Sequence, residues 1–83
     1  MAEFTIYSKP DCSFCDKAKY LLMANGLTYE ELVLDMGQVK EDGVQYYTVQ
    51  ELKELVPNAR TVPQIFRNNN LLGGFEALRT SLQ

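Results

Sequence analysis

The chain has 83 residues, 46% of them hydrophobic, with two cysteines and a formal net charge of −3. This length suits one domain covering residues 1–83, and the negative charge argues against nucleic acids and anionic membranes as partners. No apolar run approaches the ~20 residues that a membrane-spanning helix needs, and the start Met1-Ala2-Glu3 lacks the pattern of a secretory signal. We therefore expect a cytoplasmic protein, in a reducing compartment where disulfides tend to be transient and catalytic.

The first third of the sequence predicts a strand, a helix and a second strand. Residues 4–7 are mostly β-branched or aromatic and predict a buried strand, which ends at Lys9-Pro10-Asp11. Apolar residues then recur at helical spacing, at Phe14, Ala18, Leu21 and Leu22. Asn25-Gly26 ends this helix, because glycine suits the left-handed position after a helix, and residues 28–34 predict the next strand. The short links imply a right-handed unit with two parallel strands.

The middle of the sequence predicts a long loop and a short helix. Residues 35–47 combine glycines with mixed charges, which favours an irregular loop. The segment Thr48-Val49-Gln50-Glu51 has the pattern of a capping box, so a helix should run over about residues 49–55. Its expected apolar face consists of Leu52, Leu55 and Val56, and Pro57-Asn58 stops it.

The last third predicts a hairpin and a final helix. Residues 64–67 and 71–72 flank Asn68-Asn69-Asn70, which is typical of a hairpin turn. A helix over residues 75–82 follows, with Leu78 and Leu82 facing inward. The expected α/β fold is thus a four-stranded mixed sheet, made of a βαβ unit plus a β-hairpin, with three helices packed on it.

The two cysteines, Cys12 and Cys15, lie where the first strand gives way to the first helix. A helix N-terminus offers free backbone N–H groups and the positive end of the helix dipole, and both favour a thiolate. Cys12 is therefore the predicted nucleophile, and Cys15, one turn further, can close an intramolecular disulfide with it. Two structural cysteines are the plainer interpretation. A zinc site would need other ligands or a second chain, because the sequence has no histidine.

Three separated segments together resemble the glutaredoxin family: Lys9-Pro10-Asp11-Cys12-Ser13-Phe14-Cys15, Thr61-Val62-Pro63-Gln64-Ile65-Phe66 and Gly73-Gly74-Phe75-Glu76. The loop before the second helix and the ending Gly-Gly-Phe-Glu-Ala-Leu-Arg are also similar to phage-encoded members. The resemblance implies the thioredoxin fold in its minimal form. It also implies a glutathione-dependent thiol–disulfide oxidoreductase, in which Cys12 attacks a disulfide and Cys15 or glutathione resolves the intermediate.

The resemblance further implies a glutathione site. Lys9 would bind the glycine carboxylate, a cis Pro63 would turn the Val62 backbone toward the ligand, and Gly74 would let the γ-glutamyl end approach a helix N-terminus. The implied contacts are Lys9, Phe14, Gln50, Thr61, Val62, Pro63, Gly74, Phe75 and Glu76. A solvated lysine, a surface glutamine and a plain glycine turn are the simpler interpretations at three of these positions.

Two departures from the family pattern keep other functions open. Ser13 replaces the proline of many dithiol members, and some members without it bind a [2Fe–2S] cluster between two chains through the first cysteine, here Cys12, and glutathione. Glu76 stands where Asp, Ser or Thr is usual, which favours an electron donor linked to thioredoxin reductase as a further alternative. Otherwise we expect a monomer that acts on disulfide-containing or glutathionylated proteins, with ribonucleotide reductase a candidate acceptor by analogy.

Overall fold

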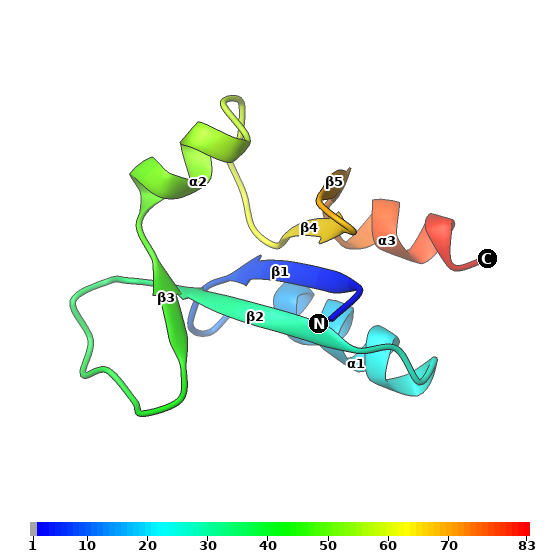
Figure 1. Ribbon diagram of the computed structural model, residues 1–83, viewed down its shortest axis with the longest axis horizontal. Coiled ribbons are helices and arrows are strands. Elements are labelled where there is room, and N and C mark those ends of the chain that lie inside the picture. Colours follow the sequence, from blue (N-terminus) through cyan, green and yellow to red (C-terminus); the bar gives the residue numbers. More distant parts are fainter. Residues whose placement is uncertain (1) are drawn as a thin grey trace.

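A computed structural model describes residues 2–83 and shows one mixed five-stranded sheet flanked by three helices (Figure 1). The strands are β1 (Phe4–Ser8), β2 (Tyr29–Leu34), β3 (Gln45–Tyr47), β4 (Gln64–Arg67) and β5 (Asn70–Gly73). The helices are α1 (Ser13–Ala24), α2 (Val49–Leu55) and α3 (Phe75–Ser81). None of these helices is long and apolar enough to cross a lipid bilayer.

The strands lie in the order β3-β2-β1-β4-β5. β1 pairs with β2 in parallel and with β4 antiparallel, so the predicted βαβ unit and the predicted hairpin meet at the central strand. β4 and β5 form that hairpin around Asn68 and Asn69, which both have positive φ angles of 49° and 69°. Asparagine tolerates this left-handed conformation, which a two-residue hairpin turn requires.

The predicted count of four strands is wrong, because the sheet has a fifth strand inside the predicted loop of residues 35–47. β3 pairs with β2 in parallel, and the N–H of Asp35 donates to the carbonyl oxygen of Tyr47 at 2.8 Å. This strand has only three residues, which is too short for an alternating pattern to be visible in the sequence. The irregular part is thus residues 36–44, which project at the left edge of Figure 1.

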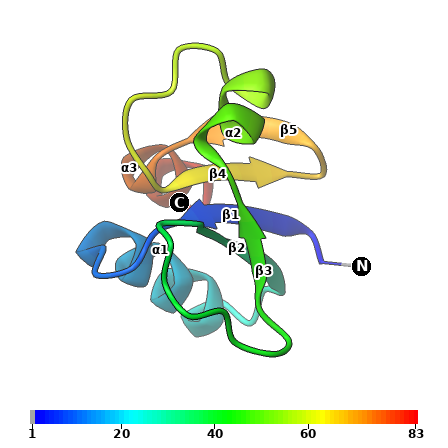
Figure 2. The same ribbon diagram turned by 90° about the vertical axis from the view of Figure 1, so that its left-hand side faces the viewer.

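Two hydrophobic cores form on opposite faces of the sheet, since side chains alternate along β1. Phe4 and Ile6 face α1 and α3, whereas Tyr7 packs on the α2 side. Figure 2 shows α1 and α3 together on one side of the strands. The first core contains Phe4, Ile6, Ala18, Leu22, Ile65 and Leu78. The second contains Tyr47, Leu52 and Val56.

The helix ends follow the predicted signals. Gly26, just beyond α1, has a φ of 69°. At the start of α2 both hydrogen bonds of the capping box between Thr48 and Glu51 are present. The predicted apolar faces are partly wrong, because Phe14 and Leu55 are 52% and 55% exposed. Each of these residues lies near one end of its helix, where less of the rest of the protein covers the apolar face.

Candidate active site

The predicted pair of cysteines forms a disulfide at the start of α1. Cys12 is the residue that precedes the helix, and the N–H of Cys15 donates to the Cys12 Sγ at 3.2 Å. The two Cα atoms lie 5.2 Å apart across the Cys12–Cys15 bond. Asp11 adopts a φ of 55°, which turns the backbone sharply between β1 and the helix. The helix start therefore presents its first N–H groups to the sulfur of Cys12.

The two sulfur-bearing residues differ in their access to solvent. Cys12 is 7% exposed, whereas Cys15, within the first turn of α1, is 1% exposed. An external thiol or disulfide can therefore reach the Cys12 sulfur more easily than that of Cys15. This difference suits Cys12 as the attacking group and Cys15 as the resolving one.

The second predicted segment lies directly beside the disulfide. The Val62–Pro63 peptide bond is cis, as the resemblance implied. The carbonyl oxygen of Val62 lies 3.8 Å from the Cys12 Sγ. A Cβ atom on Gly74 would lie 3.7 Å from the Pro63 carbonyl oxygen, so the third segment closes the same corner of the molecule. Three segments far apart in sequence thus converge on the reactive sulfur.

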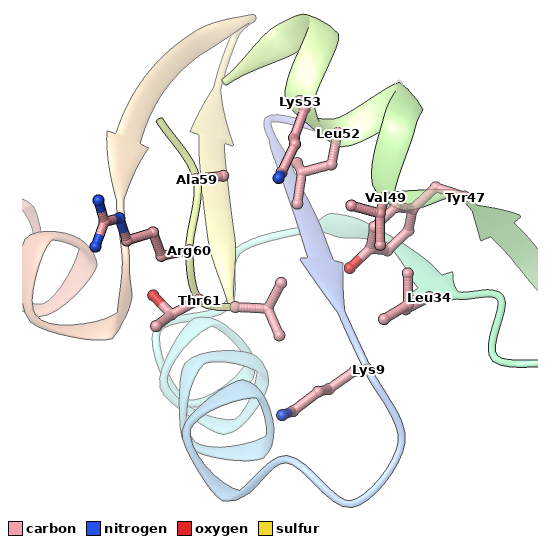
Figure 3. A pocket seen from close by; sticks show the side chains of 10 residues that line it. Lys9, Leu34, Tyr47, Val49, Leu52, Lys53, Ala59, Arg60 and Thr61 are labelled. Atoms are coloured by element: carbon pink, nitrogen blue, oxygen red, sulfur yellow. The ribbon is translucent and has the colours of Figure 1, made fainter. Parts of the chain in front are cut away.

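A pocket opens next to this corner, between α2 and the turn after β1 (Figure 3). Of the predicted contacts it gathers Lys9, Thr61 and Val62. Gln50 is exposed and is not among the residues that line it; α2 instead contributes Val49, Leu52 and Lys53. Figure 3 shows the Lys9 and Lys53 side chains reaching toward the pocket from opposite walls.

The remaining predicted contacts lie on the other side of the disulfide. The rings of Phe14 and Phe75 are 6.1 Å apart and bring together the starts of α1 and α3. Within the described part of the protein, no side chain donates or accepts a capping hydrogen bond at the N-terminus of α3, at Gly74. The carboxylate of Glu76 pairs with the Arg79 guanidinium at 2.7 Å within the same helix. This wall thus offers aromatic surface and backbone N–H groups.

Two further features of the site have no direct signal in the sequence. Tyr47 is buried, and its hydroxyl donates to the Ser8 carbonyl oxygen at 2.8 Å, immediately before the active-site turn. Lys53 lies one helical turn after Val49, on the face of α2 that lines the pocket. Only the helical spacing from the capping box could have suggested the direction of Lys53.

A polar network lies one turn beyond Cys15. The Glu31 Oε2 accepts hydrogen bonds from the Ser8 Oγ at 2.6 Å and from the Lys19 Nζ at 2.8 Å. Burial alone would lower the pKa of Lys19, but the hydrogen bond and charge of Glu31, with Asp16 nearby, outweigh it and raise this pKa. The network ties α1 to β1 and β2 near the active-site turn.

Among residues 2–83, no group of three or more His, Cys, Asp or Glu side chains is placed to hold a metal ion. A cluster at Cys12 would need ligands from outside the molecule.

Comparison with known proteins identifies the family. The family model described as "Glutaredoxin" matches residues 4–72. The chain belongs to the glutaredoxin family. Glutaredoxin 3 of Escherichia coli is 32% identical over 80 residues, which cover 94% of this chain and 83% of that protein. The mitochondrial glutaredoxin-2 of Bos taurus is 38% identical over 69 residues, covering 83% of this protein and 40% of that one.

Solved structures of glutaredoxins share the fold. Glutaredoxin C1 from a Populus hybrid, in its holo form, superposes with a TM-score of 0.73 at 28% identity, covering 99% of this protein and 68% of that one. A buckwheat glutaredoxin–glutathione complex gives a TM-score of 0.72 at 25% identity, with coverage of 98% and 68%. This glutaredoxin therefore has a thioredoxin-like fold, and its family supports thiol–disulfide oxidoreductase activity.

Proposed function

We propose that this glutaredoxin reduces protein disulfides and glutathione mixed disulfides, with glutathione as the electron source. The observation that carries the proposal is the greater exposure of Cys12, which directly precedes α1, than of Cys15 within its first turn. The Cys12 thiolate attacks a substrate sulfur, a new S–S bond forms, and the other sulfur leaves as a thiolate. Cys15 then attacks Cys12, which releases the reduced substrate and leaves the intramolecular disulfide. Two glutathione molecules restore the dithiol and become oxidised glutathione.

The proposed glutathione site spans both walls beside the disulfide. The ligand cysteine pairs with the backbone of Val62, and its glycine carboxylate points into the pocket toward Lys9. Its γ-glutamyl end lies at the start of α3, against Gly74 and Phe75. The existence of a glutathione complex of the buckwheat relative supports glutathione as the ligand.

The proposal extends to partners and compartment. The substrates are disulfide-containing and glutathionylated proteins, with ribonucleotide reductase as a candidate acceptor by family analogy. Reduction of the Cys12–Cys15 bond by glutathione requires a reducing compartment such as the cytoplasm. We therefore propose the cytoplasm as the site of action and a monomer as the active form.

The first test compares wild type, Cys12→Ser and Cys15→Ser in glutathione-coupled reduction of a small mixed disulfide. We expect Cys12→Ser to lose activity by about a thousandfold or more, because it removes the nucleophile. Cys15→Ser should keep activity on this substrate, because glutathione can resolve the intermediate directly. The measurement is NADPH consumption through glutathione reductase.

Two results would contradict the proposal. Equal activity of Cys12→Ser and wild type would show that the thiol is not the nucleophile. A wild-type protein that glutathione does not reduce, but that thioredoxin reductase and NADPH do, would instead identify an electron donor of the thioredoxin-reductase type.

Binding of a bridging [2Fe–2S] cluster is a second candidate function. Ser13 favours it, because this residue replaces the proline of many dithiol members. Each of two protein molecules would supply its Cys12 thiolate, and glutathione would supply the remaining ligands. Anaerobic reconstitution with iron, sulfide and glutathione tests it: a cluster would give visible absorption that Cys12→Ser abolishes. A colourless product rules this candidate out.

A further inference from the structure

Most lysines and arginines of this acidic protein either form ion pairs or line the pocket beside Cys12. Among residues 2–83, four of the eight lysines and arginines form ion pairs: Lys19, Lys40, Arg67 and Arg79. Of the other four, three line this one pocket: Lys9, Lys53 and Arg60. No carboxylate is among the described residues that line it. A protein with net charge −3 therefore keeps a positive pocket next to its reactive sulfur.

The three cations occupy different parts of the pocket. Lys9 and Lys53 reach toward it from opposite walls, one from the turn after β1 and the other from α2 (Figure 3). Arg60 lines the rim, with its guanidinium directed away from both lysines. The proposed function uses one carboxylate of glutathione in this pocket, and Lys9 suffices for it. Lys53 is thus a second cation to which the proposed function assigns no anion.

We propose that Lys53 makes this glutaredoxin selective for protein disulfides in which acidic residues follow the reactive cysteine. The inference rests on the proposed orientation of glutathione, in which the residue that follows the ligand cysteine enters the pocket. A protein substrate that pairs with the Val62 backbone in the same direction delivers its next residues to Lys9 and Lys53. Carboxylates at those positions neutralise both ammonium groups, whereas basic side chains are repelled.

The pocket walls favour a peptide over a small ion. Leu34, Tyr47 and Leu52 line it together with the cations, so the peptide's aliphatic stems have apolar surface beneath its charged ends. The pocket also extends to Val62, whose carbonyl oxygen lies 3.8 Å from the Cys12 sulfur. A substrate cysteine bonded to Cys12 can therefore place its following residues there.

The experiment follows mixed-disulfide formation directly. The Cys15→Ser protein, whose only thiol is Cys12, reacts with peptides whose cysteine carries thionitrobenzoate. The Cys12 thiolate bonds to the peptide sulfur, the old S–S bond breaks, and thionitrobenzoate leaves with the electron pair as a coloured thiolate. Three peptides are compared: Cys followed by two Glu, Cys followed by two Gln, and two Glu placed before Cys.

We expect the peptide with Glu after Cys to react about tenfold faster than the other two at low salt, and the difference to shrink at high ionic strength. Adding Lys53→Gln should reduce this preference about threefold, as expected for loss of one exposed charge pair. Lys17→Gln is the matched control, because it removes the same charge outside the pocket, from a lysine that lies over the Phe14 ring on the other side of the disulfide.

Four outcomes would contradict one or the other hypothesis. Equal rates for all three peptides, or a preference that Lys53→Gln and Lys17→Gln reduce equally, would overturn the inference and leave the redox function intact. A faster reaction when Glu precedes Cys would also overturn it. No thionitrobenzoate release from any peptide would contradict the proposed role of Cys12 itself.

Discussion

Tyr47 fixes the backbone from which the active-site turn begins. It is 2% exposed, its ring lies edge-on to Tyr7 with centroids 5.1 Å apart, and its hydroxyl donates to the Ser8 carbonyl oxygen. Burial, followed by the nearby Tyr7, raises the pKa of Tyr47 to about 12. A neutral phenol is thus part of the folded structure far into the alkaline range.

Tyr47→Phe should lower the free energy of unfolding by about 1–3 kcal/mol, because it leaves a buried carbonyl without its donor. The raised pKa has a further consequence. The folded state keeps the proton that the unfolded protein loses near pH 10, so this contribution is present below pH 10 and is lost as the pH rises toward 12. Urea denaturation from neutral pH to about pH 11 should show a smaller alkaline loss in Tyr47→Phe than in wild type.

Tyr20→Phe is the control for this measurement, because Tyr20 is 74% exposed. It should leave the stability at neutral pH unchanged. An equal alkaline loss in wild type and Tyr47→Phe would mean that the buried phenol is not the titrating group.

At the scale of elements, α2 is a short part of the site that depends on its surroundings for stability. It has seven residues, carries Lys53, and buries only Leu52 within its length. Helices this short are not stable alone, so tertiary packing and capping must hold it. The reciprocal bonds between Thr48 and Glu51, at 3.1 and 2.8 Å, satisfy two N–H groups at its start.

Thr48→Ala should therefore lower the free energy of unfolding by about 1 kcal/mol. Thermal unfolding followed by circular dichroism measures this loss. Thr80→Ala, at an exposed position near the end of α3, serves as the control and should change stability little. A Thr48→Ala protein as stable as wild type would show that tertiary packing holds α2 without the capping box.

Local signals explain which elements the sequence could predict. The capping box, the glycine after α1 and the paired asparagines each act within a few residues, and each is found where expected. β3 could not be found in this way, because its three residues form a strand only by pairing with β2. The exposure of Leu55 likewise depends on how α2 sits on the sheet, which no local pattern records.

At the scale of the whole molecule, the fold brings three distant segments together at one end of the sheet, where the reactive cysteines lie. The end of β1, the cis peptide before β4 and the start of α3 meet there, while the two cores hold the sheet from both faces. The family resemblance predicted this convergence, and the spacing of the two cysteines at the helix start predicted that they can form the Cys12–Cys15 disulfide. The pocket-facing position of Lys53 and the bond from Tyr47 to Ser8 join distant parts of the sequence, so they required the structure.

The hydrogen bond from the Cys15 N–H to the Cys12 sulfur has a consequence for the energetics of turnover. The atom that exchanges electrons also caps α1, and a thiolate accepts this bond more strongly than a disulfide sulfur does. The thiolate therefore stabilises the first helical turn, and the formed turn favours reduction by the same free energy. Helix fraying and redox equilibrium are therefore thermodynamically coupled. A substitution that loosens the first turn of α1 will shift the equilibrium toward the disulfide without touching either cysteine.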